Sequence, residues 1–217
     1  MSYEEVIGRV AKAAARAGRE PEDITLVAVS KTKPVDVIMK IYELGHRDFG
    51  ENRAQELAEK APQLPDDIRW HFVGTLQSNK ARLIRSVTHL LHSMDRQSLA
   101  GAWIKGFGVA PPVLLQVNTG DEDQKSGVSP AEASALTDRL IESGLQVVGL
   151  MAIPPIPEQP DDSRNHFVAL RELRTKISEN HPSVSALSMG MTDDFEVAIE
   201  EGASIIRVGR AIFGARN

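Results

Sequence analysis

The sequence predicts an α/β fold, a single (β/α)8 TIM barrel spanning residues 1–217. Three observations predict this fold class. Short apolar runs lack polar alternation, which is typical of parallel strands buried on both faces. Helix-like stretches separate the runs, which begin about 20 to 40 residues apart, close to the length of a strand with its crossover helix. A chain of 217 residues is also a common size for a barrel of one domain.

Eight apolar runs are the predicted strands, and most are rich in Val, Ile or Leu. They occupy residues 24–31, 47–50, 70–74, 89–95, 113–118, 147–153, 186–190 and 205–209. Strict alternation of strands and helices implies parallel strands with right-handed crossovers. An open, doubly wound sheet is the main alternative. Against it, no phosphate-binding glycine fingerprint follows the first run, and the count of eight favours a closed barrel.

The helical stretches have apolar residues at helical spacing and recognisable ends. A first helix near residues 4–17 would cover the bottom of the barrel. Glycine ends three later stretches, which are residues 35–44, 130–143 and 193–201. The last of these opens with Asp193-x-x-Glu196, a variant of the capping box.

The composition is that of an ordinary globular protein, with 41% hydrophobic and 25% charged residues. A formal net charge of −5 provides no overall attraction to nucleic acid or anionic membranes. Cysteine is absent, which excludes disulfides, thiolate nucleophiles and Cys-ligated metals. Acids stand where a signal peptide has a basic flank, and no apolar run is long enough to span a bilayer. We therefore expect a cytoplasmic protein and, with no evident dimer surface, a monomer.

Lys31 is the first candidate for chemistry. Ligands of barrels bind at the C-terminal ends of the strands, and Lys31 follows a nearly unbroken apolar strand. Desolvation and neighbouring cations lower a lysine pKa and make the neutral amine available for Schiff-base chemistry. Lys31 taken alone is more simply a solvated lysine at a strand end. Lys33 is the competing amine, but side-chain alternation places Lys31 on the face of Val27 and Val29, whereas Lys33 belongs to the turn.

Two glycine turns follow the last two predicted strands, at residues 188–192 and 209–210. Barrels often bind phosphate at these two positions through backbone N–H groups. Ser188 and Thr192 add hydroxyl groups, and Gly190 and Gly209 allow close approach of the backbone. Each turn alone is explained as a tight turn, but the pair predicts an anion site.

Arg207 lies inside the eighth predicted strand, which neighbours the first strand in a closed barrel. Arg207 and Lys31 can therefore face one ligand. A buried arginine needs an acceptor, which is either this ligand or a carboxylate on a neighbouring strand.

The remaining polar residues support fewer assignments. Glu51 and Asn52 follow the second strand and either cap a helix or line the ligand rim. His89 and His92 are three apart in a predicted strand, so they point to opposite faces and make a poor metal pair. No HExxH or GxSxG pattern occurs, so metal-dependent hydrolysis and a serine triad are unsupported. We predict no metal and assign no catalytic residue.

An amine, a guanidinium and an anion cradle together suggest a phosphorylated aldehyde held as an imine. Pyridoxal 5′-phosphate fits that description. Several motifs, in order along nearly the whole chain, resemble the YggS/PROSC family of pyridoxal phosphate homeostasis proteins. They are LVAVSKTKP (26–34), FGEN (49–52), WHFVGTLQSNK (70–80), GLMAI (149–153), LSMGMTDD (187–194) and RVGRAIFGAR (207–216).

The resemblance implies a fold-type-III barrel similar to the N-terminal domain of alanine racemase. It assigns Lys31 to the imine and Arg207 to the pyridine nitrogen, with Asn52 beside the ring. The phosphate contacts that it implies come from Ser188 and from the backbone of Gly190, Met191, Gly209 and Arg210. Thr192 in the same turn remains a cofactor-binding candidate through its hydroxyl group. Arg210 stands where we expect a smaller residue such as Thr in relatives, which a backbone contact would tolerate.

Arginine beside the pyridine nitrogen disfavours ring protonation and weakens carbanion stabilisation. The chain also lacks room for the second domain of alanine racemase, and Tyr3 and Tyr42 lie outside the strand ends. We therefore expect a carrier of pyridoxal phosphate in B6 and amino-acid homeostasis, without efficient catalysis and with pyridoxal-phosphate-dependent apoenzymes as candidate partners. A small amino-acid racemase with the same cofactor is the first alternative, and a cofactor-free Schiff-base aldolase is the second.

Overall fold

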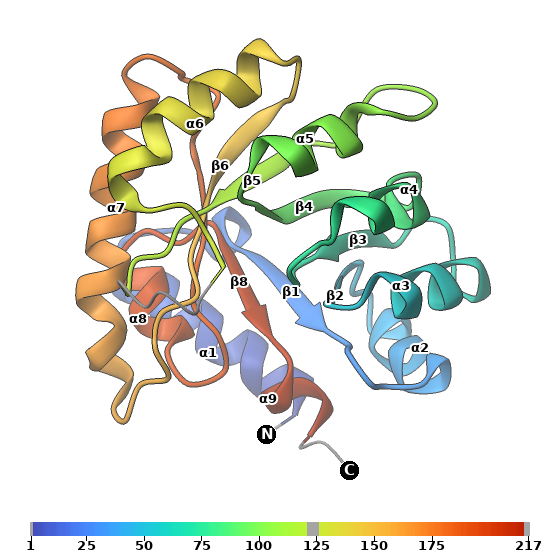
Figure 1. The fold of residues 1–217 in the computed structure, drawn as a ribbon. Coiled ribbons are helices and arrows are strands. Elements are labelled where there is room, and N and C mark those ends of the chain that lie inside the picture. The colour runs from blue at the N-terminus through green and yellow to red at the C-terminus, as the bar shows by residue number, and fades with distance from the viewer. Residues whose placement is uncertain (1, 121–125, 215–217) are drawn as a thin grey trace.

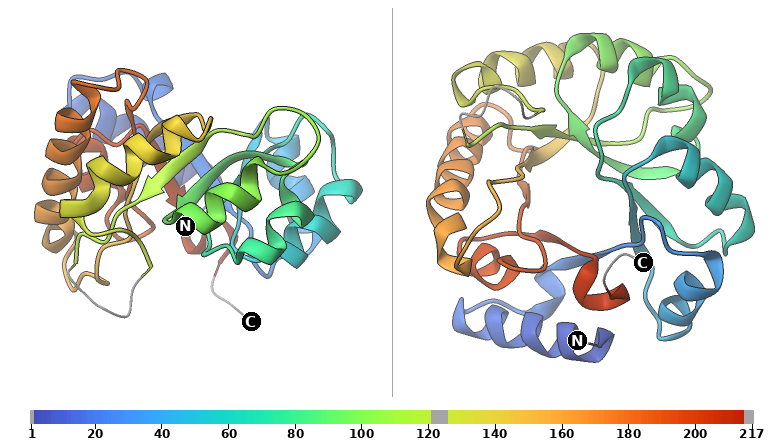
Figure 2. Two further views of the ribbon diagram at one scale, coloured as in Figure 1. Left: turned by 45° about the horizontal axis from the view of Figure 1, so that its top comes forward. Right: turned by 60° about the horizontal axis from the view of Figure 1, so that its bottom comes forward.

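The computed structural model describes residues 2–120 and 126–214. Within these ranges, eight parallel strands close in sequence order into a barrel that helices surround (Figure 1). Figure 2 shows the helices arranged outside the strands in a second direction of view. The first and last strands pair along the closure, where Val27 lies opposite Arg207. The predicted barrel is therefore confirmed, and the alternative of an open sheet is wrong.

The strands begin and end within two to three residues of most predicted runs. Their bounds are β1 (Thr25–Val29), β2 (Asp48–Glu51), β3 (Arg69–Phe72), β4 (Thr88–Met94), β5 (Val113–Gln116), β6 (Val147–Met151), β7 (Ala186–Ser188) and β8 (Ile205–Val208). All neighbouring pairs are parallel, because a helical or irregular connection returns the chain to the same end of the barrel each time.

The longer helices form the outer layer. In the described residues they are α1 (Tyr3–Arg16), α2 (Val35–Glu43), α3 (Ala54–Lys60), α4 (Ala81–Ile84), α5 (Gln97–Ile104), α6 (Pro130–Glu142), α7 (Arg164–Ser178), α8 (Phe195–Glu200) and α9 (Arg210–Phe213). Short 3-10 turns lie at Pro21–Asp23, Ala61–Gln63, Ser78–Lys80 and Pro160–Ser163. Ala215 and Arg216, at the end of the last sequence motif, lie outside the described residues.

The predicted capping box at Asp193 is wrong. Helix α8 begins at Phe195 after the N-cap residue Asp194, and the exposed Asp193 pairs with Arg210 instead. The Asp194 carboxylate accepts hydrogen bonds from the Ser163 hydroxyl at 2.7 Å and from the Met191 N–H at 2.7 Å. The sequence pattern was misleading because the helix begins one residue later and the Asp193 carboxylate pairs with Arg210, a tertiary contact, instead of capping the helix.

The core has an apolar layer between the strands and helices and a second cluster inside the barrel. The outer layer contains large, fully buried side chains such as Phe49, Trp103 and Phe195. The inner cluster is made of Val27, Val29, Leu90, Leu114, Met151 and Ile205. Truncating a buried aromatic residue of the outer layer would cost about 3–5 kcal/mol through lost burial and the cavity left behind. The apolar runs of the sequence thus fill both faces of each strand.

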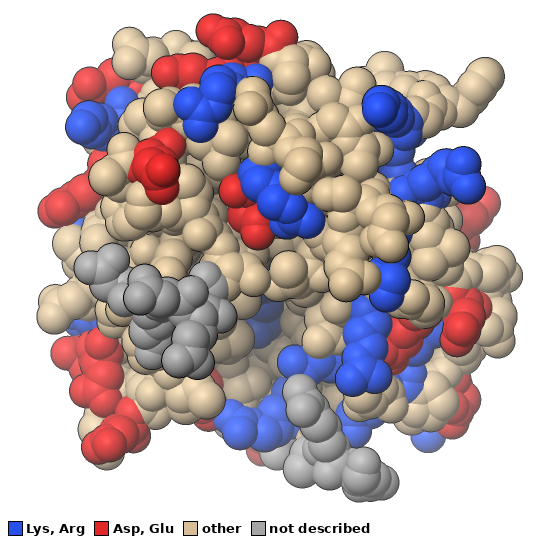
Figure 3. Space-filling model, in the orientation of Figure 1, with Lys and Arg blue, Asp and Glu red and all other residues tan. Residues whose placement is uncertain are grey.

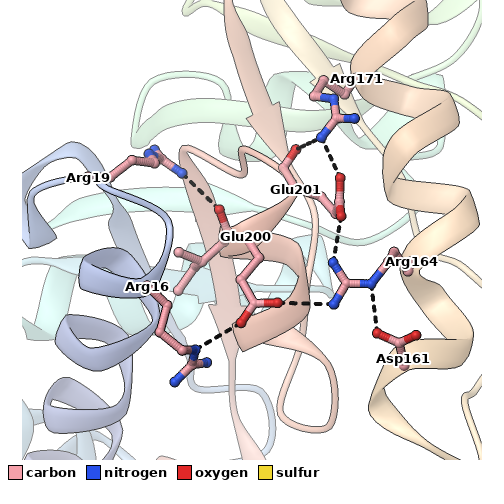
Figure 4. A network of polar contacts seen from close by, with 8 residues as sticks. Arg16, Arg19, Asp161, Arg164, Arg171, Glu200 and Glu201 are labelled. Atoms are coloured by element: carbon pink, nitrogen blue, oxygen red, sulfur yellow. Dashed lines mark hydrogen bonds and ion pairs between the residues drawn. The ribbon is translucent and has the colours of Figure 1, made fainter.

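Charged side chains join the first helix to the last part of the chain (Figure 4). Arg16 of α1 pairs with Glu200 of α8 at 3.0 Å, and Glu200 also pairs with Arg164 of α7 at 3.0 Å. Arg164 continues the network to Glu201 at 2.6 Å and to Asp161 at 2.7 Å. Hydrogen bonds to these carboxylates raise the pKa of Arg164 above its ordinary value. The network therefore ties α1 to the helices that follow β6 and β7.

Candidate functional site

A cavity of about 720 Å³ opens at the C-terminal ends of the strands, the face on which barrels bind ligands. Lys and Arg side chains gather around the hollow in the lower half of Figure 3, where β1 and β8 end in the same view in Figure 1. Most of the predicted site residues line this cavity, namely Lys31, Asn52, Met191, Thr192, Arg207, Gly209 and Arg210. Ser188 and Gly190 are not on its wall.

Lys31 sits in a tight turn that directly follows β1. Thr32 has a positive φ of 64°, and the Lys33 N–H donates to the Ser30 carbonyl at 3.0 Å. A positive φ is uncommon for a residue with a Cβ, so surrounding contacts must hold this turn. The turn directs the chain away from the barrel and leaves Lys31 on the cavity wall.

Charged residues of β2 and α3 supply those contacts. The buried Lys60 ammonium donates to the Ser30 carbonyl at 3.0 Å, and Glu56 accepts the Thr32 N–H at 2.6 Å. Lys60 also pairs with Glu51 at 2.7 Å and with Glu56 at 2.6 Å. The backbone on each side of Lys31 is therefore held by one ion cluster, which we call the lysine clamp (Glu51, Glu56 and Lys60).

Glu51 is part of this clamp and neither caps α3 nor lines the cavity. It is fully buried, and one of its carboxylate oxygens accepts from Ser30 at 2.7 Å. Its second oxygen has no hydrogen-bond partner among the described residues. Burial raises the pKa of Glu51, while hydrogen bonds from Lys60 and Ser30 act in the opposite direction. Asn52, the other candidate from this motif, does line the cavity.

Asn52 is fixed by close packing against the end of the neighbouring strand. A Cβ placed on Gly74 would lie 2.2 Å from the Asn52 carbonyl oxygen. Only glycine fits at position 74, so the backbone of the two strand ends can touch there. This backbone contact fixes the position of Asn52 on the cavity wall.

The turn after β7 is shaped by Gly190, which has a φ of 90°. A Cβ on Gly190 would lie 2.5 Å from the Ala198 side chain, so the turn packs tightly against α8. Met191 and Thr192 follow on the cavity wall, and the Met191 N–H donates to Asp194. Asp194 therefore stabilises the same turn that sequence analysis assigns to a phosphate.

The turn after β8 approaches the backbone of β1. A Cβ on Gly209 would lie 3.0 Å from the Val29 carbonyl oxygen. Arg210 begins α9, is exposed on the cavity rim and pairs with Asp193 of the preceding turn. The two predicted phosphate turns are thus joined to each other at the mouth of the cavity.

Arg207 is a buried cation whose acceptors are neutral. Its guanidinium donates to the Ser188 hydroxyl at 2.6 Å and to the Ala152 carbonyl at 2.9 Å. Burial lowers the pKa of Arg207 to about 10, although the Asp194 charge acts against this shift. The alternative that a carboxylate on a neighbouring strand accepts from Arg207 is wrong for the residues that the structure describes. One side of Arg207 reaches the cavity wall.

Ser188 is a predicted site residue whose side chain does not line the cavity. It is fully buried, and its hydroxyl contacts Arg207 and the His92 ring inside the barrel. The hydroxyl is engaged there and does not face the cavity, so in this arrangement it supports Arg207 and makes no wall for a phosphate. His92 is likewise fully buried, whereas His89 is exposed, as their spacing along β4 predicts.

The residues of the cavity fit an anionic aldehyde cofactor. A lysine amine and a guanidinium share one wall with glycine turns whose backbone can approach a ligand closely. The cavity also lies within the size range of small-molecule sites, about 300–1,000 Å³. In the described part of the chain, no group of three or more His, Asp or Glu side chains is arranged to hold a metal ion. No helix there is long and apolar enough to cross a membrane.

Comparison with known proteins identifies relatives along the whole barrel. The family model for the N-terminal domain of alanine racemase matches residues 6–217. The pyridoxal phosphate homeostasis protein of Aquifex aeolicus is 43% identical over 97% of this chain and 95% of its own length. The protein of the same name from Escherichia coli K12 is 41% identical over 98% of this chain and 94% of its own length.

Solved structures agree with this relationship. PipY of Synechococcus elongatus, in its structure with pyridoxal phosphate bound, superposes with a TM-score of 0.80 at 33% identity over 94% of this chain and 100% of that chain. Alanine racemase of Corynebacterium glutamicum has a TM-score of 0.74 at 16% identity, over 98% of this chain and 62% of the racemase, a likeness of fold alone. This chain belongs to the family of pyridoxal phosphate homeostasis proteins, which have the fold of the alanine racemase N-terminal domain.

Proposed function

We propose that this protein binds pyridoxal 5′-phosphate through the Lys31 amine and acts as a carrier in intracellular pyridoxal phosphate (vitamin B6) and amino-acid homeostasis. The observation that carries the proposal is that Lys31 and the buried Arg207 line one cavity. The names of the relatives and the cofactor bound to PipY support it. The cofactor, when bound, supplies an aldehyde carbon that a lysine amine captures reversibly.

Each cavity residue has a proposed task toward that cofactor. Lys31 holds the aldehyde end, and the lysine clamp keeps the Lys31 backbone in place. The phosphate end lies at the turns of residues 190–192 and 209–210, where Thr192 and backbone N–H groups donate; the Met191 N–H is not among these donors, because it donates to Asp194. Arg207 faces the pyridine nitrogen, and Asn52 lies beside the ring.

The arginine favours binding over catalysis. A cation beside the pyridine nitrogen disfavours its protonation, which weakens the ring as an electron sink. Neither Tyr3 nor Tyr42 is among the residues that line the described cavity: Tyr3 contacts His46 at 3.2 Å and Tyr42 donates to Asp67 at 2.8 Å. We therefore expect no efficient turnover of amino acids.

A racemase with the same cofactor is the second candidate, because the family model that matches is named for alanine racemase. Incubation with single enantiomers of alanine or serine separates the two functions. Racemisation at ordinary enzyme rates, about 1–1,000 per second, would contradict the carrier. A carrier gives no turnover on that scale. Further expectations are a monomeric cytoplasmic protein that passes the cofactor to pyridoxal-phosphate-dependent apoenzymes and binds neither nucleic acid nor membrane.

The test of the proposed function is the cofactor's attachment site. Purified protein mixed with pyridoxal phosphate should turn yellow, and borohydride reduction followed by peptide mapping should find the label on Lys31. Lys31→Ala should stay colourless. Lys33→Ala, which removes the neighbouring cavity amine, is the matched control and should remain yellow. A label on Lys33, or a colourless wild-type protein as expected of a cofactor-free aldolase, would refute the assignment.

A further inference from the structure

A chain of side-chain hydrogen bonds crosses the inside of the barrel from Arg207 to the opposite wall. The guanidinium lies 2.6 Å from Ser188 Oγ, Ser188 Oγ lies 2.8 Å from His92 Nδ1, and His92 Nε2 lies 2.9 Å from His71 Nδ1. The chain ends where His71 Nε2 meets the Asp48 carboxylate at 3.1 Å. Five strands thus contribute one residue each: β8, β7, β4, β3 and β2.

The central residues of this hydrogen-bond chain are buried away from solvent. Ser188 and His92 are fully buried, and His71 is 2% exposed. Buried polar groups that are fully hydrogen-bonded hold one arrangement, and each bond polarises the next in a medium of low dielectric. The barrel interior otherwise contains an apolar cluster, so these residues occupy space that aliphatic side chains fill elsewhere.

The two terminal groups of the hydrogen-bond chain, Arg207 and Asp48, fix which atom donates in every hydrogen bond between them. A guanidinium can only donate, so Ser188 Oγ is the acceptor for Arg207. An ionised carboxylate can only accept, so His71 carries a proton on Nε2. With neutral rings, His71 Nδ1 must then accept from His92 Nε2–H, and His92 Nδ1 must accept from the Ser188 hydroxyl. All donors therefore point from Arg207 toward Asp48.

The surroundings of His92 are consistent with a neutral ring. Burial lowers the pKa of His92 well below its ordinary value, and the charge of Arg207 acts in the same direction. Burial alone would raise the pKa of Asp48, but hydrogen bonds from Arg69 and His71 hold it well below its usual range. Asp48 is thus ionised at neutral pH, and His92 is uncharged.

We propose that His92 and His71 are positioning residues for Arg207. The inference rests on the proposed function, in which Arg207 faces the cofactor. Ser188 presents a lone pair to the guanidinium while its proton is directed at His92 Nδ1, and His71 fixes the His92 tautomer that leaves Nδ1 free to accept. The pair of histidines therefore holds a buried cation in place with neutral acceptors, so that its charge is available to the cofactor ring.

The first test needs no substitution. Long-range ¹H–¹⁵N spectra of histidine-labelled wild-type protein at pH 7.5 report which ring nitrogen carries the proton. We expect the Nε2–H tautomer for both His71 and His92, without added cofactor and with pyridoxal phosphate. A proton on Nδ1 of either ring, or a doubly protonated ring, would overturn the proposal irrespective of how the variants fold.

The second test measures cofactor binding. His92→Leu leaves Ser188 without its acceptor, so we expect at least tenfold weaker pyridoxal phosphate binding and a shifted absorption maximum of the bound cofactor. His92→Asn keeps an acceptor near the Nδ1 position and should bind within about threefold of wild type. His89→Gln is the control and should match wild type, because His89 is exposed on the same strand and contacts the His71 ring only by edge-to-face packing, without a hydrogen bond to the five residues in the described structure.

These outcomes separate the two proposals. If wild type and His89→Gln fail to bind pyridoxal phosphate, the proposed function fails while the tautomer result still decides the hydrogen-bond chain. If both bind and a folded His92→Leu binds equally well with an unchanged spectrum, the positioning role is refuted and the proposed function stands.

Discussion

Lys31 has its position because charged side chains hold the backbone on either side of it. Lys60 contacts the Ser30 carbonyl, and Glu56 contacts the Thr32 N–H. The Lys60 side chain is only 10% exposed, so its ammonium depends on these acceptors for solvation. The same ions that stabilise the turn therefore decide where the reactive amine stands.

Replacing Lys60 should affect both stability and cofactor attachment. Lys60→Met leaves Glu51 and Glu56 unpaired, and removing one partner of a buried ion pair typically costs about 3–5 kcal/mol. We expect a loss near the lower end of this range in urea unfolding, together with slower formation of the yellow complex. Lys40→Met, at an exposed lysine of α2, is the control. Equal stability and equal rates for the two variants would exclude a role for the clamp.

The Asp48 carboxylate makes stability depend on pH. Its pKa is lowered in the folded protein by Arg69 and His71 against the effect of burial, so the unfolded chain binds the proton more tightly. The stabilisation is complete above the unfolded pKa near 3.9 and falls by about 1.4 kcal/mol per pH unit below it.

Asp48→Asn should accordingly destabilise the protein at pH 7 by about 2 kcal/mol, because the ion pair with Arg69 is lost and the hydrogen bond from His71 no longer ends on a charged acceptor. The difference from wild type should shrink by about 1 kcal/mol at pH 3, measured by urea unfolding. Asp66→Asn, at an exposed carboxylate, serves as the reference. A difference that stays constant down to pH 3 would contradict the assigned direction of the shift.

At the scale of elements, glycines set how closely neighbouring backbones approach. A Cβ on Gly149 of β6 would lie 2.1 Å from the Ala186 carbonyl oxygen of β7. The obstacle is backbone, which cannot rotate away like a side chain. Ser188 and the turn of residues 190–192 follow directly along β7. A change in the spacing between β6 and β7 would therefore also displace the proposed cofactor site.

We expect Gly149→Ala to lower stability by more than about 3 kcal/mol or to prevent folding, as overpacking without room to relax does. Gly8→Ala is the matched control in the exposed interior of α1, where a Cβ meets no atom within 4 Å among the described residues. It should raise stability by about 1 kcal/mol through helix propensity. Thermal unfolding of both variants measures the contrast. Similar melting temperatures would contradict this prediction, because they would show that β6 and β7 can move apart enough to accommodate the added Cβ.

At the scale of the whole molecule, closure of the barrel brings the two ends of the chain together. β1 pairs with β8, and α1 packs beside α8 with the ion network of Arg16, Glu200 and Arg164 between them. Lys31 and Arg207 line one cavity because that closure places β1 beside β8.

The ion network should contribute a small, salt-dependent part of the stability. Glu200→Gln removes the charge that pairs with Arg16 and Arg164, which are about a third to half exposed, so solvent screening limits the expected loss to about 0.5–1 kcal/mol at low ionic strength. At 1 M NaCl the Debye length is about 3 Å, and the loss should fall toward zero. Glu172→Gln, exposed on α7, is the control. A loss that does not change with salt would show that these contacts act by packing.

Most of the fold and much of the candidate site can be predicted from the sequence, and particular residues show which features cannot. The apolar runs predict all of the strands, and Lys31, Asn52, Thr192 and Arg207 reach one cavity as expected. Ser188 faces Arg207 and His92 instead, because a three-residue β7 places it inside the barrel. Lys60 lies in a helix and carries no pattern in the sequence that predicts its burial against Glu51 and Glu56. No pattern in the sequence links His71 to His92, since they lie on different strands.

The sequence by itself determined the periodicity of apolar residues, the positions of the glycine turns and the order of strands and helices. These depend on local chemistry: backbone freedom, helix ends and burial of a whole strand. Tertiary structure alone decided which charges became buried together, namely the lysine clamp and the chain from Arg207 to Asp48. The physical reason is that the free energy of a buried charge depends on partners tens of residues away, which only closure of the barrel brings within hydrogen-bond distance.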